Sequence, residues 1–175
     1  MQKILMVYST VDGQTKEICE QMQMHIGTSA DVDIYSLKYA AELDLNNYQK
    51  IVVGASIRYG KFRPELFSFI EKNKKQLIEK KSSFFSVNVV ARKPHKNTPQ
   101  TNPYMKKFLE KSPWQPDSMA VFAGKIDYPK YGWFDRTMIR FIMWMTKGPT
   151  DINGCYEFTD WDKVEQFAQE LVIAR

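Results

Sequence analysis

Short apolar runs alternate with amphipathic helical patterns along nearly the whole chain, and this alternation limits the folds that the chain can adopt. Five runs are expected to be buried strands, because each is short, apolar and bounded by turn residues: Ile4–Tyr8, Val32–Ser36, Lys50–Ser56, Ser83–Val90 and Ser118–Ile126. Helices are predicted between them, over Gln14–Ile26, from Pro64 through Ile78, over Tyr104–Glu110 and over Trp161–Ala174. Strands that alternate with helices indicate a parallel sheet covered on both faces.

The predicted fold class is therefore α/β, a doubly wound five-stranded parallel sheet with the strand order 2-1-3-4-5. Ligands in this architecture bind at the carboxyl ends of the strands, beside strand 1. A single domain over residues 1–175 is expected, because a chain of this length can bury one core and shows neither a repeat nor a linker. No signal peptide is expected, because the sequence opens directly on a strand-like run. No membrane-spanning segment is expected, because no run of about eighteen apolar residues occurs.

The charge and cysteine content narrow the classes of partner. A net charge of +5 and a pI of about 9.1 favour an anionic partner, which could be nucleic acid, an anionic membrane surface or an acidic small molecule. Nucleic acid is not expected, because aromatic and basic residues do not interleave on any predicted strand. The only cysteines, Cys19 and Cys155, form no CxxC pair, so neither a disulfide framework nor a metal site is expected and a reducing compartment fits.

The stretch YSTVDGQT, residues 8–15, follows the first predicted strand and opens the first predicted helix. Free N–H groups and the helix dipole favour an anion at such a junction, and the hydroxyls of Ser9, Thr10 and Thr15 can donate further hydrogen bonds. Gly13 permits a positive φ and close approach of the backbone. The stretch matches neither the GxxxxGK(S/T) phosphate loop nor GxGxxG. It predicts a phosphate site without a counter-cation, and a simple polar capping turn is the alternative.

This loop resembles the S/T-x-S/T-G-x-T phosphate loop of flavodoxins, which binds the phosphate of FMN. Asp12 stands where that pattern has a hydroxyl residue, and it is expected to cap the helix or turn instead. Three longer stretches, residues 52–62, 86–102 and 128–145, resemble the family of menaquinone-dependent protoporphyrinogen IX oxidases, or dehydrogenases, which act in haem synthesis on a long-chain flavodoxin scaffold. The resemblance extends from Lys3 to about Ala168.

The resemblance implies a flavodoxin-like fold with a long insertion in the last strand, residues 128–154. It implies FMN as cofactor and oxidation of protoporphyrinogen IX to protoporphyrin IX, with electrons passed to menaquinone or ubiquinone. No catalytic side chain is predicted beyond the flavin, because no nucleophile–base constellation or carboxylate pair can be argued. A peripheral location on the cytoplasmic face of the inner membrane follows. The alternatives are a flavodoxin electron carrier and an NAD(P)H:quinone reductase of the same superfamily.

The same resemblance assigns the FMN site to three loops. The expected cofactor-binding residues are Ser9, Thr10, Val11, Asp12, Gly13, Gln14 and Thr15, then Ala55, Ser56, Ile57, Tyr59 and Gly60, and then Asn88, Val89 and Ala91. Tyr59 is expected to stack on one face of the ring system. The third loop contains no aromatic residue up to Asn102, so the other face is expected to be open unless Tyr104 or the insertion covers it.

The stretch ARKPHK places several cations in the third loop. Protoporphyrinogen carries two propionates, and Arg is suited to hold a carboxylate with two hydrogen bonds. The predicted substrate-binding residues are Arg58, Arg92, Lys93 and Lys96. A solvated surface run is the alternative, and His95 is not expected to be essential.

The insertion is predicted to contain an amphipathic helix with a narrow basic side and a broad apolar side. It is too short and too charged to span a bilayer, but it suits an anionic membrane surface and access to a lipid-dissolved quinone. The residues predicted for membrane and quinone contact are Trp133, Phe134, Arg136, Met138, Arg140, Phe141 and Trp144. Packing onto the protein's own core and a homo-oligomer interface are the alternatives.

Overall fold

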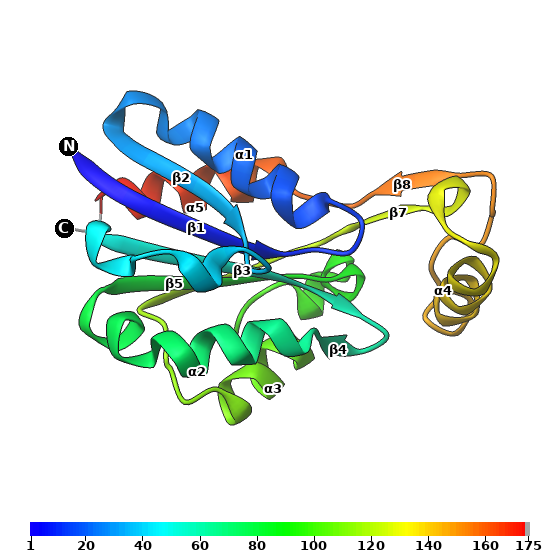
Figure 1. Ribbon diagram of the computed structural model, residues 1–175. Coiled ribbons are helices and arrows are strands. Elements are labelled where there is room, and N and C mark those ends of the chain that lie inside the picture. Colours follow the sequence, from blue (N-terminus) through cyan, green and yellow to red (C-terminus); the bar gives the residue numbers. More distant parts are fainter. Residues whose placement is uncertain (174–175) are drawn as a thin grey trace.

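The computed structural model describes residues 1–173 (Figure 1). Its strands are β1 (Gln2–Ser9), β2 (Ala30–Ser36), β3 (Lys50–Arg58), β4 (Lys61–Phe62), β5 (Lys81–Val87), β6 (Ser118–Phe122), β7 (Lys125–Asp127) and β8 (Cys155–Glu157). Its α-helices are α1 (Gln14–Ile26), α2 (Pro64–Glu79), α3 (Pro103–Lys111), α4 (Trp133–Met145) and α5 (Trp161–Ile173). The predicted end of the last helix, Ala174, lies outside the described residues.

The central sheet has the order β2-β1-β3-β5-β6, and all of these neighbouring strands are parallel. Counted in chain order without the short β4, this is the predicted order 2-1-3-4-5, which is confirmed. The strand β4 adds an antiparallel hairpin to the end of β3, in which Ile57 pairs with Phe62. Carboxyl ends of the parallel strands therefore meet at one edge, where the loops after β1, β3 and β5 lie.

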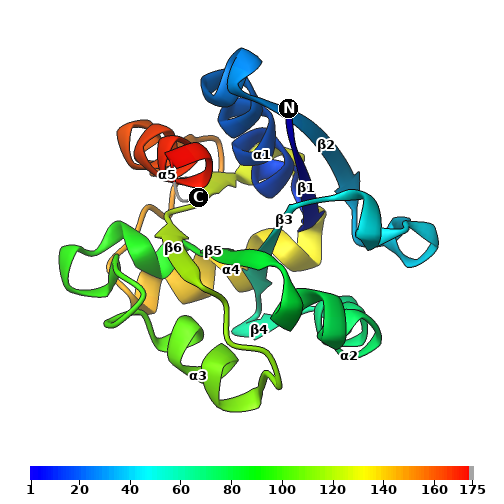
Figure 2. The same cartoon turned by 90° about the vertical axis from the view of Figure 1, so that its left-hand side faces the viewer.

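Helices cover both faces of the sheet, with α1 and α5 on one side and α2 and α3 on the other (Figure 2). Alternate residues of β1 serve the two cores: Ile4 contributes to one and Leu5 to the other, both with no exposed surface. Because both faces of the strand are buried, its sequence is a continuous apolar run and does not alternate between apolar and polar residues. Gly54 in β3 leaves room for the Phe85 ring, which an added Cβ would meet at 2.2 Å.

Two predicted strands end earlier than expected. The run Ser83–Val90 leaves the sheet at Val87, because the Asn88 side chain accepts a hydrogen bond from the backbone N–H of Ala91 at 3.1 Å and begins a 3₁₀ turn. The run Ser118–Ile126 is divided into β6 and β7. The second part, β7, lies outside the central sheet and pairs with β8 instead.

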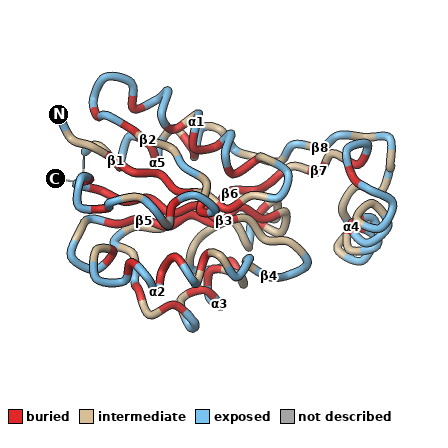
Figure 3. The backbone as a smooth tube through the Cα atoms, in the orientation of Figure 1, coloured by how far each residue is buried: buried red, intermediate tan, exposed pale blue. Residues whose placement is uncertain are grey.

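The segment between β7 and β8 forms an arm beyond the carboxyl ends of the central strands, with α4 at its tip (Figures 1 and 3). The arm has a small core of its own, made of Ile126, Tyr128, Tyr131, Ile139 and Met143. Within residues 1–173, no helix has the length and apolar character needed to cross a bilayer.

The two thiols differ in environment, which predicts a difference in reactivity. Cys19 in α1 is fully buried, and burial raises the pKa of its thiol, whereas Cys155 in β8 is exposed. We expect one thiol per chain to react rapidly with a chromogenic disulfide reagent in the folded protein and a second only after unfolding. Cys155→Ser should remove the rapid phase, and its persistence in that variant would contradict the burial of Cys19.

Candidate functional site

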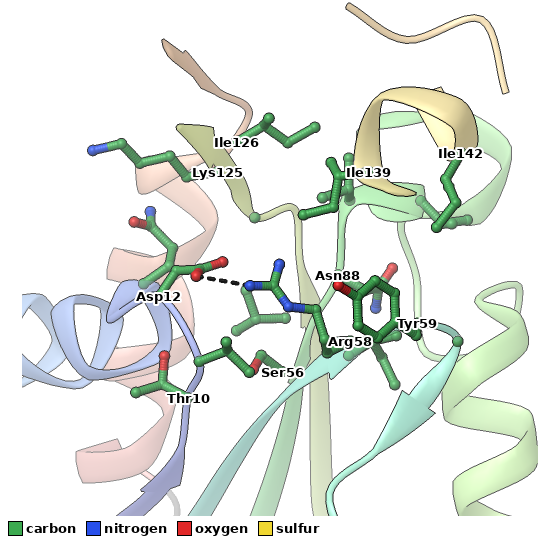
Figure 4. Close-up of a pocket in the computed structure, with 18 of the residues that line it drawn as sticks. Thr10, Asp12, Ser56, Arg58, Tyr59, Asn88, Lys125, Ile126, Ile139 and Ile142 are labelled. Carbon is green, nitrogen blue, oxygen red and sulfur yellow. Dashed lines mark hydrogen bonds and ion pairs between the residues drawn. The ribbon is translucent and has the colours of Figure 1, made fainter. Parts of the chain in front are cut away.

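A pocket lies at the carboxyl edge of the sheet, between the loops after β1, β3 and β5 and the inner face of α4 (Figure 4). The space between these elements is about 830 Å³ when the solvent at its open mouth is included. Its lining is Thr10, Val11, Asp12, Gln14, Ser56, Ile57, Arg58, Tyr59, Gly60, Val87, Asn88, Val89, Val90, Tyr104, Gly124, Lys125, Ile126, Tyr131, Ile139, Ile142 and Met143.

The first loop has the properties of an anion site. Gly13 adopts a φ of 93° at the start of α1, and its N–H donates to the Thr10 hydroxyl at 2.9 Å. The hydroxyl of Thr15 is fully buried in the first turn of α1 and finds no hydrogen-bond partner among the described residues. A buried hydroxyl without a partner costs free energy, so a ligand oxygen at this helix N-terminus would relieve that cost. The loop therefore fits a phosphate group.

The side chains of Ser9 and Gln14 in this loop form hydrogen bonds to other parts of the protein. Ser9 donates to the Glu65 carboxylate at 2.6 Å, and Gln14 donates to Glu157 and Thr159 at 3.1 and 2.9 Å. Gln14 thereby ties the loop to the segment that follows the insertion. Both side chains shape the loop through protein contacts, so the hydroxyl protons of Thr10 and Thr15 are the side-chain donors of this loop that remain without an acceptor among the described residues.

The expectation that Asp12 caps the helix or turn is wrong. The residue at the cap position of α1 is Gly13, which has no side-chain cap, and the Asp12 carboxylate instead accepts a hydrogen bond from Arg58 at 3.0 Å. Burial raises the pKa of the Asp12 carboxyl, and the Arg58 guanidinium opposes that shift. Arg58 is the last residue of β3, so this ion pair joins two residues of the lining that come from the first loop and from the end of β3 (Figure 4).

The second loop is a two-residue hairpin turn, Tyr59-Gly60, with φ values of 50° and 74°. A positive φ at both positions suits this turn, but it is unusual for a bulky aromatic residue. The Tyr59 hydroxyl donates to the Asp135 carboxylate at the start of α4. This contact fixes the second loop to the insertion.

The third loop forms hydrogen bonds to Asn102 and to the end of α4. Asn102, with no exposed surface, donates to the Asn88 side chain at 3.1 Å and to the Lys96 carbonyl at 2.8 Å. Arg92 donates to the Val89 carbonyl at 3.0 Å and to the carbonyl and hydroxyl of Thr146 at 2.9 and 3.1 Å. Since Thr146 ends α4, Arg92 fixes the far end of this helix to the third loop.

Most of the predicted cofactor residues surround the pocket, whereas most of the predicted substrate residues do not line it. Ten of the predicted cofactor residues form part of the lining: Thr10, Val11, Asp12, Gln14, Ser56, Ile57, Tyr59, Gly60, Asn88 and Val89. Gly13 borders the adjoining pocket, and Ser9, Thr15, Ala55 and Ala91 are buried and line neither pocket. Of the four predicted substrate residues, Arg58 lines the pocket.

Sequence reasoning did not assign the part of the lining that comes from the insertion. Tyr104 and Tyr131 both line the pocket, so α3 and the insertion contribute aromatic residues of the kind that the third loop lacks. The inner side of α4 adds Ile139, Ile142 and Met143. Their spacing of three and four residues is helical, but the outer side of the same helix is equally apolar, so the pattern did not distinguish the two sides.

Most residues of α4 are exposed (Figure 3), and those on its outer side are mainly apolar. Trp133, Phe141 and Trp144 have 80%, 51% and 69% of their surface exposed. The other exposed apolar residues of the helix are Phe134, Met138 and Met145. Arg140 is exposed beside this surface, while Arg136 is half-buried and donates to the Tyr131 carbonyl at 3.2 Å.

Fold and loops together define a flavodoxin-like protein. A family model described as a flavodoxin domain matches residues 5–153. Two oxidised flavodoxins from Bacillus cereus share the fold: Flavodoxin 1 with a TM-score of 0.56 at 15% identity over 99% of both chains, and Flavodoxin 2 with a TM-score of 0.54 at 17% identity over 98% of this chain and 97% of that one.

Closer relatives identify the branch. A protein from Escherichia coli (strain K12) named protoporphyrinogen IX dehydrogenase (quinone) is 44% identical over 170 residues, which cover 97% of this chain and 94% of that protein. A protein of the same name from Leishmania major is 42% identical over 171 residues, which cover 97% of this chain and 74% of that one. The chain therefore belongs to the family of quinone-dependent protoporphyrinogen IX dehydrogenases, which are oxidoreductases.

Proposed function

We propose that the pocket binds FMN, with the phosphate at the first loop and the ring system between the second and third loops. The observation that carries this proposal is the buried Thr15 hydroxyl without a partner at the N-terminus of α1. Bound FMN would supply a two-electron acceptor that a quinone can reoxidise. The residues of this chain position it, exclude water and cover it from the insertion side through Tyr131.

The reaction is the oxidation of protoporphyrinogen IX to protoporphyrin IX, with menaquinone or ubiquinone as electron acceptor. Six electrons and six protons leave the substrate in three two-electron steps, and three quinones become three quinols. The membership of the chain in this enzyme family supports the assignment. No side chain is assigned as a catalytic acid or base.

We still assign the binding of the propionates to the predicted substrate residues Arg58, Arg92, Lys93 and Lys96. The contacts of each residue in the structure indicate which role it has. Arg58 is the cation of this set that lines the pocket. The guanidinium of Arg92 already donates to three oxygen atoms of the protein. We therefore assign Arg92 to positioning α4 while it contributes charge, and Lys93 and Lys96 to direct contact with a carboxylate.

The exposed side of α4 is proposed to rest on the anionic cytoplasmic face of the inner membrane. A quinone dissolved in lipid must reach the pocket from the bilayer, and α4 separates the pocket from this exposed surface. Aromatic residues at headgroup depth beside cations are typical of interfacial helices. The predicted residues Trp133, Phe134, Met138, Phe141 and Trp144 would enter the interface, with Arg136 and Arg140 at its edge.

Anaerobic mixing of FMN-loaded protein with protoporphyrinogen IX tests the function. We expect the flavin absorbance at its visible maximum to bleach and then to recover when a menaquinone analogue is added, while the porphyrin Soret band grows. Riboflavin-free, FMN-free protein is the control. A flavin that stays oxidised would contradict the proposal; bleaching by NAD(P)H, or a stable semiquinone in a redox titration, would instead favour the reductase or carrier alternative.

A further inference from the structure

The pocket is divided into a polar part and an apolar part. Hydroxyl, amide and charged side chains of the first and second loops surround one part, where the proposed FMN phosphate lies. The other part is the apolar lining that the third loop and α4 contribute, namely Val89, Val90, Ile139, Ile142 and Met143. This apolar part is suited to the hydrocarbon portion of a ligand.

Cations gather at the end of α4 that borders this apolar part. Arg92 donates to the Thr146 carbonyl, so Lys93, next to Arg92, and Lys147, next to Thr146, lie on either side of this contact. Desolvation, followed by the charges of Arg92, Lys96 and Lys147, lowers the pKa of Lys93, in keeping with the placement of these cations around the contact between Arg92 and Thr146. Within residues 1–173, Lys93, Lys96 and Lys147 form no ion pair with a carboxylate.

Lys147 occupies a backbone position where glycine is the usual residue. It follows α4 with a φ of 58°, and the N–H of Gly148 donates to the Met143 carbonyl at 2.7 Å to close the helix end. A positive φ is costly for a residue with a Cβ, and such strain is concentrated at functional sites. Glycine or asparagine would close the helix with less strain, so at Lys147 a cationic side chain stands at a strained backbone position.

We propose that the apolar part of the pocket and the adjacent cations form the binding site for an amphipathic carboxylate with a broad apolar body, in which Lys147 and Lys93 hold one carboxylate. The inference rests on the proposed function, because it assigns a propionate of the porphyrinogen to this place. It adds Lys147 to the substrate-binding residues and makes the inner side of α4 the wall against which the tetrapyrrole packs.

Arg92 acts as a positioning residue in this arrangement. Its guanidinium packs against Gly148, where an added Cβ would lie 3.1 Å from one of its nitrogens and 2.6 Å from the Met143 sulfur. The contact brings Lys147 to the third loop and holds Met143 against the pocket. Loss of the guanidinium would therefore displace the lysine without removing it.

Binding of protoporphyrin IX and of its dimethyl ester to the FMN-loaded protein, followed by fluorescence in a non-ionic detergent, tests the site. We expect Lys147→Asn to raise the Kd for the dicarboxylate roughly 5- to 10-fold, as for the loss of one charge-assisted contact at a partly exposed site. The Kd for the uncharged ester should not change, and Lys147→Arg should retain most of the affinity. Thermal stability of Lys147→Asn should be equal or higher, because asparagine tolerates the backbone conformation.

Lys74→Gln on α2 is the matched control, since it removes the same charge from an exposed position on the body of the protein. An equal change in Kd in Lys74→Gln and Lys147→Asn, or an equal loss for the ester, would overturn the inference. Failure of the wild-type protein to oxidise protoporphyrinogen would contradict the proposed function itself. Normal oxidation with unchanged porphyrin binding in Lys147→Asn would contradict the carboxylate site alone.

Discussion

Replacing Thr15 with valine is expected to weaken FMN binding about 10- to 100-fold without loss of stability. The two side chains have the same shape, so the packing of the first turn of α1 is retained. The hydroxyl has no partner among the described residues and is fully buried, so its removal should leave the free energy of unfolding equal or slightly higher. A hydrogen bond to a charged phosphate is worth roughly 1.5–3 kcal/mol, which sets the size of the expected loss.

The measurement is a titration of apoprotein with FMN followed by quenching of flavin fluorescence, repeated with riboflavin. Riboflavin lacks the phosphate, so its affinity should be the same in wild type and Thr15→Val. Thr28→Val makes the same chemical change in the turn beyond the far end of α1, at an exposed position, and should leave the affinity for FMN intact. An unchanged FMN affinity in Thr15→Val would show that this hydroxyl does not contact the phosphate.

The first loop also shows what the sequence predicts well. Apolar runs of strand length and the polar residues that follow them place β1, β3 and β5, and therefore the three loops of the pocket, at one edge of the sheet. These features depend on neighbouring residues in the chain. The role of Asp12 did not follow in the same way, because its partner Arg58 is 46 residues away and no local pattern reports that ion pair.

The insertion shows what the sequence could not predict. Helical spacing and composition predict an amphipathic helix within residues 128–154, and the structure contains α4 there. However, Ile139 and Met143 face inward while Phe141 and Trp144 face outward, and all four are large and apolar. Hydrophobicity alone cannot separate a wall of the pocket from an exposed surface in such a helix. The contacts of Tyr59 with Asp135 and of Arg92 with Thr146, which orient the helix, join distant segments.

Substitution of Trp133, Phe141 and Trp144 by serine is expected to lower vesicle binding on the order of 100-fold or more. These side chains are largely exposed on one side of α4, and the rings of Phe141 and Trp144 are neighbours, with centroids 6.1 Å apart. Full burial of such a side chain is worth roughly 1.5–3 kcal/mol, so partial insertion of three supplies several kcal/mol. The flavin spectrum should stay native, because Ile139 and Met143 still pack inward.

Co-sedimentation with vesicles that contain an anionic lipid, compared with zwitterionic vesicles, measures this effect and its dependence on charge. The control replaces Met24, Ile78 and Ile173, which are also exposed but lie near the ends of α1, α2 and α5, away from α4. Undiminished sedimentation of the α4 variant would contradict the membrane proposal. If the wild type does not sediment and the substitutions instead convert a dimer to a monomer in analytical ultracentrifugation, the exposed side of α4 is a homo-oligomer interface, because the same apolar surface can be covered by lipid or by a second copy of the chain.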